Sequence, residues 1–153
     1  MPIQYIGMTD KEKQLAEKYP EAAIFAAIAE SVWQGSKATV KMELQVTGKL
    51  RAELQRLLGT DVHTLFVTDS DIRHIKKQHG KGEASRGQID VTPDDIALIP
   101  IVLNEFDTAE HTETDRRGNK KILFKKRIDE TVYLATIERG PHKGEIRTLW
   151  KTP

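Results

Sequence analysis

Two histidines, His74 and His79, lie five residues apart in a short polar segment that also holds Ile72 and Ile75. Imidazole titrates near neutral pH, so a histidine can accept or donate a proton during a reaction. At 100° per residue the two isoleucines predict the buried stripe of a helix over 70–79. His79 falls toward the core side at the helix C-terminal end, where the helix dipole favours imidazolium and burial opposes it. His74 falls nearly opposite the stripe.

Both histidines also have ordinary interpretations, which stay open at this point. His79 is placed where a structural histidine would bond a carbonyl at the helix end. His74 is placed where a histidine would simply face solvent. As metal ligands the pair is a poor match, because the spacing is five residues rather than four and the chain has no cysteine. We therefore expect no metal and no cofactor.

Fixed positive charge, which would stabilise a phosphate transition state, is concentrated in the C-terminal third. Between Asp90 and Asp115 there are eight acids and no lysine or arginine, whereas between Arg116 and Arg127 there are seven bases and no acids. The net charge of +1 predicts no polyanionic partner by itself. The separation of the two blocks nevertheless allows one strongly positive face. The alternative is that the blocks neutralise each other across a hairpin.

Period-two alternation predicts three C-terminal strands, at about 120–128, 131–138 and 144–151. In the first, the core face holds Ile122, Phe124 and Ile128, and the opposite, basic face holds Lys121, Leu123, Lys125 and Arg127. In the last, alternation places Ile146, Thr148 and Trp150 on one face and Arg147 and Leu149 on the other. Either Arg147, by a bidentate contact, or the Thr148 hydroxyl would suit a scissile phosphate. Otherwise Thr148 is an ordinary strand residue and Arg147 faces solvent.

The remaining elements are predicted by their local signals. Helices are expected from Thr9 to Tyr19, over 20–33, over 49–58, over 70–79 with Asp69 or Ser70 as its cap, and from a Thr92 cap onward with a possible kink at Pro100. Strands are expected over 37–47 and over 62–68, and a short helix is the alternative for 37–47. The segment 105–119 is predicted to be a loop or an edge hairpin. The whole predicts an α+β fold, with N-terminal helices packed on one face of a C-terminal antiparallel sheet and the other face open to a ligand.

The composition of the chain indicates where in the cell the protein is expected. The chain has no cysteine, its most apolar stretch, residues 22–29, is far too short to span a membrane, and its first residues do not resemble a signal peptide. We expect a cytoplasmic protein with no membrane contact.

In the order of its motifs, the segment 60–151 resembles the phage-associated nuclease domains of the barnase–EndoU–colicin–RelE-like group. The motifs are a strand over 62–67, His-Ile-x-x-x-His-Gly from His74 to Gly80, Arg-Gly-Gln at 86–88, Thr-Pro-Asp-Asp-Ile…Ile-Pro at 92–100, and Thr-x-Trp at 148–150. The resemblance implies a barnase/RelE-like fold of phage or prophage origin. Residues 59–153 would be the nuclease domain and 1–58 a helical N-terminal extension, the two forming one compact unit.

The resemblance also implies a metal-independent endoribonuclease, toxin-like, in which the RNA 2′-hydroxyl attacks the adjacent phosphate to give a cyclic phosphate. His79 and His74 would be the base and acid, Lys125, Arg127 or Arg147 the charge stabilisers, and Thr148 a phosphate contact. Further RNA contacts are expected from Arg73, Lys76, Lys77, Lys81, Arg86 and Lys121. The implied partners are RNA and an acidic immunity- or antitoxin-type protein in the host cytoplasm.

Two other functions remain open. One is a non-catalytic RNA- or protein-binding module of a phage multidomain protein, which needs the basic face but no titrating histidine. The other is an assembly domain, which would expose an apolar stripe on the helix 20–33, made of Ile24, Phe25, Ile28 and Val32.

Overall fold

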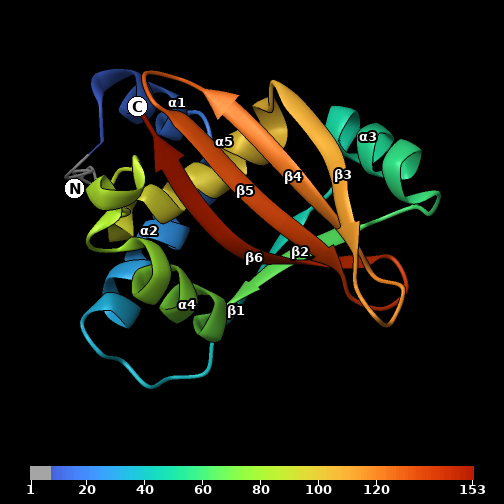
Figure 1. Ribbon diagram of the computed structural model, residues 1–153, viewed down its shortest axis with the longest axis horizontal. Coiled ribbons are helices and arrows are strands. Elements are labelled where there is room, and N and C mark those ends of the chain that lie inside the picture. The colour runs from blue at the N-terminus through green and yellow to red at the C-terminus, as the bar shows by residue number, and fades with distance from the viewer. Residues whose placement is uncertain (1–7) are drawn as a thin grey trace.

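Six strands form one sheet in the computed structural model, which describes residues 8–153 (Figure 1). They are β1 (Lys41–Gln45), β2 (Thr64–Thr68), β3 (Thr108–Thr114), β4 (Lys120–Arg127), β5 (Thr131–Glu138) and β6 (Lys143–Thr152). Their order across the sheet is β1-β2-β6-β5-β4-β3. The three predicted C-terminal strands are confirmed, and the segment 105–119 supplies the edge strand β3 of a hairpin with β4. The first seven residues, on which the expectation about a signal peptide rests, lie outside the described part.

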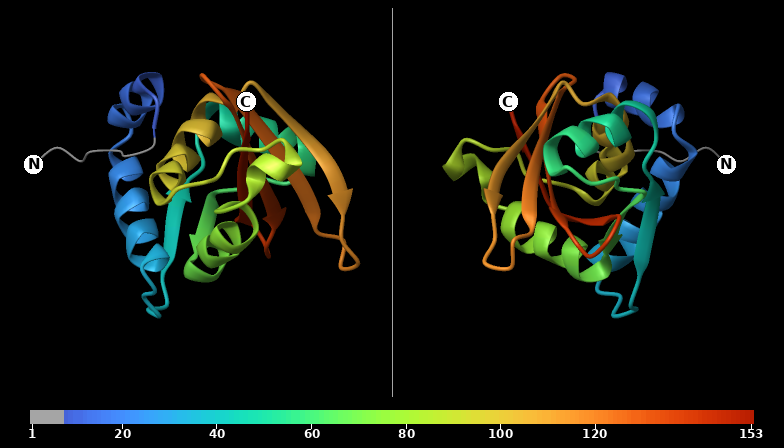
Figure 2. Two further views of the ribbon diagram at one scale, coloured as in Figure 1. Left: turned by 60° about the vertical axis from the view of Figure 1, so that its left-hand side comes forward. Right: turned by 90° about the vertical axis from the view of Figure 1, so that its right-hand side faces the viewer.

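The helices are α1 (Asp10–Glu17), α2 (Pro20–Trp33), α3 (Gly48–Leu58), α4 (Asp69–His79) and α5 (Leu98–Glu105), with 3-10 turns η1 (Glu83–Arg86) and η2 (Pro93–Ala97). α1, α2 and α5 lie together on one side of the curved sheet, and α4 runs beside β6 (Figures 1 and 2). The fold is therefore α+β, as predicted. No helix within residues 8–153 is long and apolar enough to cross a membrane.

The C-terminal strands β3 to β6 pair antiparallel, as predicted, whereas one further pair of strands in the sheet is parallel. β2 pairs with β6 in parallel, from Thr64 opposite Lys143 to Phe66 opposite Glu145. Glycine lets these strands approach without displacing a neighbour, because a Cβ atom on Gly144 would lie 2.6 Å from Cδ2 of Leu65 and that side chain would have to shift. Since α4 follows directly after β2, this parallel pairing lays the histidine helix against β6.

The cap of α4 differs by one residue from the prediction of Asp69 or Ser70. Thr68 is the cap: its Oγ1 accepts a hydrogen bond from the Asp71 amide at 3.2 Å, and its own amide donates to Oδ2 of Asp71 at 3.0 Å. This reciprocal capping box requires an acid three residues after the cap, which Asp71 supplies. Asp69 instead accepts a hydrogen bond from the Val40 amide.

The predicted alternation along the last strand is wrong at Arg147. Ala135 of β5 pairs with Thr148, but the next residue, Thr136, pairs with Ile146, so Arg147 is the extra residue of a β-bulge. Because of this extra residue, side chains before and after the bulge do not follow one continuous alternation between the two faces of the sheet. Ile146 and Leu149 therefore both lie in the core, while Arg147 and Thr148 both line the same pocket.

The apolar stripe expected to be exposed on α2 lies mostly inside the protein. Phe25 and Val32 are buried, and Ile28 is partly buried against the core. Ile24 is 58% exposed and is the one large apolar side chain exposed within residues 8–153. A single exposed isoleucine gives no support to an assembly surface on this helix.

Candidate active site

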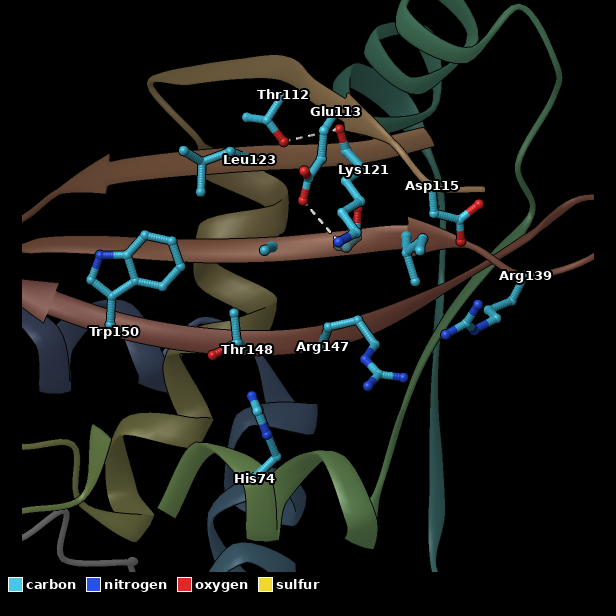
Figure 3. Close-up of a pocket in the computed structure, with 13 residues that line it drawn as sticks. His74, Thr112, Glu113, Asp115, Lys121, Leu123, Arg139, Arg147, Thr148 and Trp150 are labelled. Carbon is cyan, nitrogen blue, oxygen red and sulfur yellow. Dashed lines mark hydrogen bonds and ion pairs between the residues drawn. The ribbon is translucent and has the colours of Figure 1, made fainter. Parts of the chain in front are cut away.

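A cavity of about 500 Å³ opens on the face of the sheet that α5 does not cover (Figure 3). Strands β3 to β6 supply its floor and rim, and His74 of α4 closes one side. Leu123, Ala135 and Ile137 form an apolar floor, and Trp150 forms a wall. The cavity thus combines an apolar surface with a few charged groups, as ligand sites generally do.

The imidazole of His74 points from α4 toward Thr148 on β6 (Figure 3). Burial lowers the pKa of His74 below its usual 6.5, and the positive charges of Arg147, His79 and Lys77 lower the pKa further. The neutral imidazole is therefore the stable form near neutral pH, and it is able to accept a proton.

The β-bulge places two polar groups, the Arg147 guanidinium and the Thr148 hydroxyl, next to each other on the side of this imidazole. Thr148 Oγ1 is buried and has no hydrogen-bond partner within residues 8–153. Arg147 is half exposed, and its two ion pairs are long: Nε lies 3.6 Å from Asp71 Oδ1, and Nη1 lies 3.6 Å from Glu145 Oε1. At that length neither contact is a hydrogen bond, so the donors of the guanidinium can turn to a ligand.

Two buried carboxyl groups, those of Asp71 and Glu145, contact Arg147 and belong to the same cluster. Neither residue was identified from the sequence. Burial and the adjacent carboxyl of Glu145 raise the pKa of Asp71 to about 7, against the opposing hydrogen bonds of Thr68. Burial also raises the pKa of Glu145, but its contacts with Asp71, Arg139 and Arg147 outweigh burial and lower it overall. Asp71 and His74 are one helical turn apart, which the sequence does show, but only the parallel β2–β6 pairing brings Glu145 beside them.

Lys121 lies on the pocket rim, and its Nζ donates to Glu113 Oε1 at 2.8 Å. The acidic and basic blocks also meet where Lys126 lies 3.4 Å from Asp107. The hairpin of β3 and β4 therefore neutralises part of the basic block, as the alternative interpretation expected. Of the two arginines that line the pocket, Arg139 donates to Glu145 Oε1 at 2.8 Å, so Arg147 is the one whose guanidinium makes no hydrogen bond to a carboxylate within residues 8–153.

His79 lies behind the pocket wall rather than in the pocket. Its side chain is 14% exposed, and Nδ1 is 3.0 Å from Oε2 of the buried Glu83. Its ring stacks on Trp150, with 5.9 Å between ring centroids, and Trp150 stacks in turn on Tyr133 at 5.0 Å. Lys125 Nζ lies 5.6 Å from the centre of the Tyr133 ring, at the end of this stack of three rings. His79 and Lys125 therefore support the wall without lining the cavity.

The structure does not bring Arg127 or Arg86 to this cavity. Arg127 donates to Thr131 Oγ1 at 2.9 Å and to the Pro153 carbonyl at 3.0 Å, at the far end of β4. Arg86 is bound to Glu83 and to the Gln78 carbonyl. Both arginines thus hold chain segments together.

Four other cations predicted to bind RNA line a second cavity, of about 590 Å³, between α2 and α4. This basic groove is lined by Trp33, Arg73, Lys76, Lys77, Gly80 and Lys81. Arg73 is bound to Asp69 and to the Ser36 carbonyl, and Lys76 Nζ donates to the Trp33 carbonyl at 2.7 Å. Lys77 and Lys81 carry the charge that faces solvent most openly here. Within residues 8–153 no group of three or more His, Asp or Glu side chains is arranged to hold a metal ion.

Comparison with known proteins agrees with the motifs and the fold. A model of the phage-Barnase-EndoU-ColicinE5/D-RelE like nuclease 3 family matches residues 44–153, which include β2, α4 and the whole of strands β3 to β6. No curated protein and no solved structure matches the chain. The matched region contains His74, Arg147 and Thr148 together with the elements that position them. The chain therefore belongs to the phage-Barnase-EndoU-ColicinE5/D-RelE like nuclease 3 family and is a nuclease-like domain.

Proposed function

We propose that this domain is a metal-independent endoribonuclease that cleaves RNA by attack of a 2′-hydroxyl on the adjacent phosphate. The observation that carries the proposal is the meeting of His74, Arg147 and Thr148 around one cavity. They supply a proton acceptor, a fixed positive charge and a hydroxyl donor, and this reaction requires all three. The open cavity has the size of a small ligand site and can admit a nucleotide.

Each group has one role in the proposed reaction. Neutral His74 takes the proton of the 2′-hydroxyl as the oxygen bonds to phosphorus. Arg147 binds the non-bridging phosphate oxygens, whose charge grows in the transition state, and the Thr148 hydroxyl donates to one of them once its side chain rotates toward the cavity. The bond from phosphorus to the 5′-oxygen breaks, leaving a 2′,3′-cyclic phosphate, and the 5′-oxygen takes a proton from a water molecule. The hydroxide so formed takes the proton from His74, which restores the water and the neutral base.

This assignment changes two roles that the family resemblance implied. His79 no longer needs to touch the substrate, because its ring supports Trp150 from behind the cavity. Of the proposed charge stabilisers, Arg147 takes the role, since Lys125 faces Tyr133 and Arg127 is bound elsewhere. RNA is the expected substrate rather than DNA, because DNA lacks the attacking hydroxyl.

The direct test is to incubate the domain with a mixed RNA pool in EDTA and to identify the new ends. Wild type should leave cyclic phosphates, and His74→Ala should lose at least about a hundredfold in rate. His63→Ala is the matched control, because His63 is an exposed histidine bonded to Asp61 away from the cavity, and it should cleave normally. Cleavage by His74→Ala at the wild-type rate, or cleavage that needs added divalent cation, would contradict the proposal.

A non-catalytic RNA-binding module is the second candidate, and one observation favours it. No hydrogen bond within residues 8–153 fixes the ring of His74, whereas a catalytic base is commonly oriented by a third group. On this alternative the RNA stays intact, while binding remains and weakens steeply with salt. In either case an acidic neutralising protein would bind over Arg147 and the basic groove.

A further inference from the structure

The carboxyl groups of Asp71 and Glu145 each lie 3.6 Å from the Arg147 guanidinium, and the proposed reaction uses neither. Asp71 comes from the first turn of α4, and Glu145 lies two residues before Arg147 on β6. Asp71 Oδ1 is 3.6 Å from Arg147 Nε, and Glu145 Oε1 is 3.6 Å from Arg147 Nη1. Asp71 is 3% exposed and Glu145 is 9% exposed. Two acids buried together beside the candidate site need a physical explanation.

The neighbours of the pair determine its charge. Arg139, just after β5, donates from Nε to Glu145 Oε1 at 2.8 Å. From the end of β2, the Thr68 amide and hydroxyl each donate to Asp71 Oδ2 at 3.0 Å. His74, one turn further along α4, is mostly neutral near pH 7 because its pKa is lowered. The cluster therefore contains two arginines, two carboxyl groups and a neutral imidazole.

A single proton, bound by the pair of Asp71 and Glu145 or not, determines whether the positive charge of Arg147 is free to bind a ligand. With that proton bound, the pair carries one negative charge, which Arg139 offsets, and the charge of Arg147 is left for a ligand. Without it, two carboxylates balance two arginines, and Asp71 Oδ1 attracts Nε of Arg147. Burial and the contact with Glu145 raise the pKa of Asp71 to about 7, so this change falls in the physiological range.

We propose that Asp71, paired with Glu145, is a positioning residue for Arg147: the protonated pair releases the guanidinium to bind a phosphodiester, and the ionised pair draws it away. The inference rests on the proposed role of Arg147 as the phosphate ligand. By linkage, a phosphodiester that binds only the released guanidinium must also favour the protonated pair.

The experiment measures binding of a probe that cannot be cleaved, so that it does not depend on catalysis. A 2′-deoxy dinucleotide carries a phosphodiester that does not titrate between pH 6 and 8, and it lacks the attacking hydroxyl. Its affinity is measured from pH 6 to pH 8 by NMR titration, following the Nε–H resonance of Arg147. Wild type should bind about tenfold more weakly at pH 8 than at pH 6, because only about a tenth of a pair that titrates near pH 7 is still protonated at pH 8.

Three variants separate positioning from a merely structural role. Asp71→Asn mimics the protonated acid and keeps an oxygen for the Thr68 amide, so it should bind at pH 8 as tightly as wild type binds at pH 6. Thr68→Ala removes a hydrogen bond that stabilises the Asp71 carboxylate, so its transition should move to higher pH. Asp69→Asn changes a neighbouring buried acid on the same helical turn that lies outside the pocket, and it should keep the wild-type pH dependence.

The outcomes distinguish this inference from the proposed function. If Asp71→Asn keeps the wild-type loss of affinity at pH 8, the positioning role is overturned even if the domain cleaves RNA. If the Asp71-dependent response appears while RNA stays intact, the positioning role stands and the nuclease proposal fails. If wild type does not bind the probe at pH 6, Arg147 is not a phosphate ligand, and the positioning role is overturned with it.

Discussion

Nζ of Lys151 in the last strand lies 3.4 Å from Oε2 of Glu12 in the first helix, and both side chains are almost fully buried. Asp95 and Glu130 lie 3.0 Å from the same ammonium group. Burial by itself lowers the pKa of Lys151, but the charges of Asp95 and Glu12 outweigh burial and raise the pKa above its usual value. Glu12 precedes the region 44–153 matched by the family, so the first helix completes a polar cluster inside the nuclease-like domain.

The first prediction is that Lys151→Met destabilises the fold by about 4 kcal/mol at pH 7, because it leaves buried carboxylates without a cation. The loss should shrink as pH falls toward 4. Buried acids without a partner have raised pKa values in the folded state, and protonation of such acids favours folding. Urea unfolding at both pH values measures this change.

Thr9→Ala, which removes the α1 cap but leaves Glu12 Oε2 on Lys151, should cost about 1 kcal/mol. Equal losses at pH 7 and pH 4 would contradict the prediction.

Signals local in sequence predicted much of the fold, and contacts between distant segments account for what was missed. The histidine helix, the three C-terminal strands and the Thr92 cap were found because periodicity and capping act within a few residues. The bulge at Arg147 was not found, since it is defined only by how β6 pairs with β5. As a result, His74 and Thr148 were each identified, but Arg147 was placed on the opposite face from Thr148. Asp71 and Glu145 were also missed, because only the parallel pairing of β2 with β6 brings these two residues together.

The second prediction concerns the protonation of His74. The charge of Lys77 is one of the causes that lower its pKa, after burial, Arg147 and His79. Lys77→Met should therefore raise the pKa of His74 toward its usual value. If neutral His74 is the base, cleavage of a dinucleotide, which does not reach the basic groove, should fall at pH 6 and stay unchanged at pH 8. A histidine NMR titration and a pH–rate profile measure the two effects. Lys11→Met, an exposed lysine on α1, should change neither. A shifted pKa with an unshifted rate profile would remove His74 from the role of base.

The third prediction tests the buried hydroxyl of Thr148. Since Oγ1 is buried and has no partner within the described residues, Thr148→Val should not destabilise the fold and should raise the free energy of unfolding by up to about 1–3 kcal/mol. It should lower kcat/KM by about tenfold to a hundredfold, the range expected for a lost hydrogen bond to a charged group. Thr148→Ser keeps the hydroxyl and should retain most of the activity. A fully active Thr148→Val variant would show that the hydroxyl does not contact the phosphate.

The last prediction concerns the basic groove between α2 and α4. His74 of α4 lines the cavity, and Lys77, one turn further along the helix, lines the basic groove together with Lys81. An RNA strand that leaves the cavity over this helix would place phosphates on both lysines. Each phosphate contact with single-stranded RNA contributes about 0.7 to the slope of log affinity against log salt concentration.

The double variant Lys77→Met/Lys81→Met should therefore reduce that slope by about 1.4 for a long single strand. It should have little effect on a dinucleotide, which fills only the cavity. Fluorescence anisotropy between 50 and 200 mM salt, roughly the range in which such slopes are measured, gives the comparison. Lys11→Met is the matched control and should leave both slopes unchanged. An equal loss of affinity for the dinucleotide and the long strand would mean that the two lysines act on the cavity itself. An unchanged slope for the long strand would mean that the RNA leaves by another route, because charge that contacts no phosphate releases no counterions.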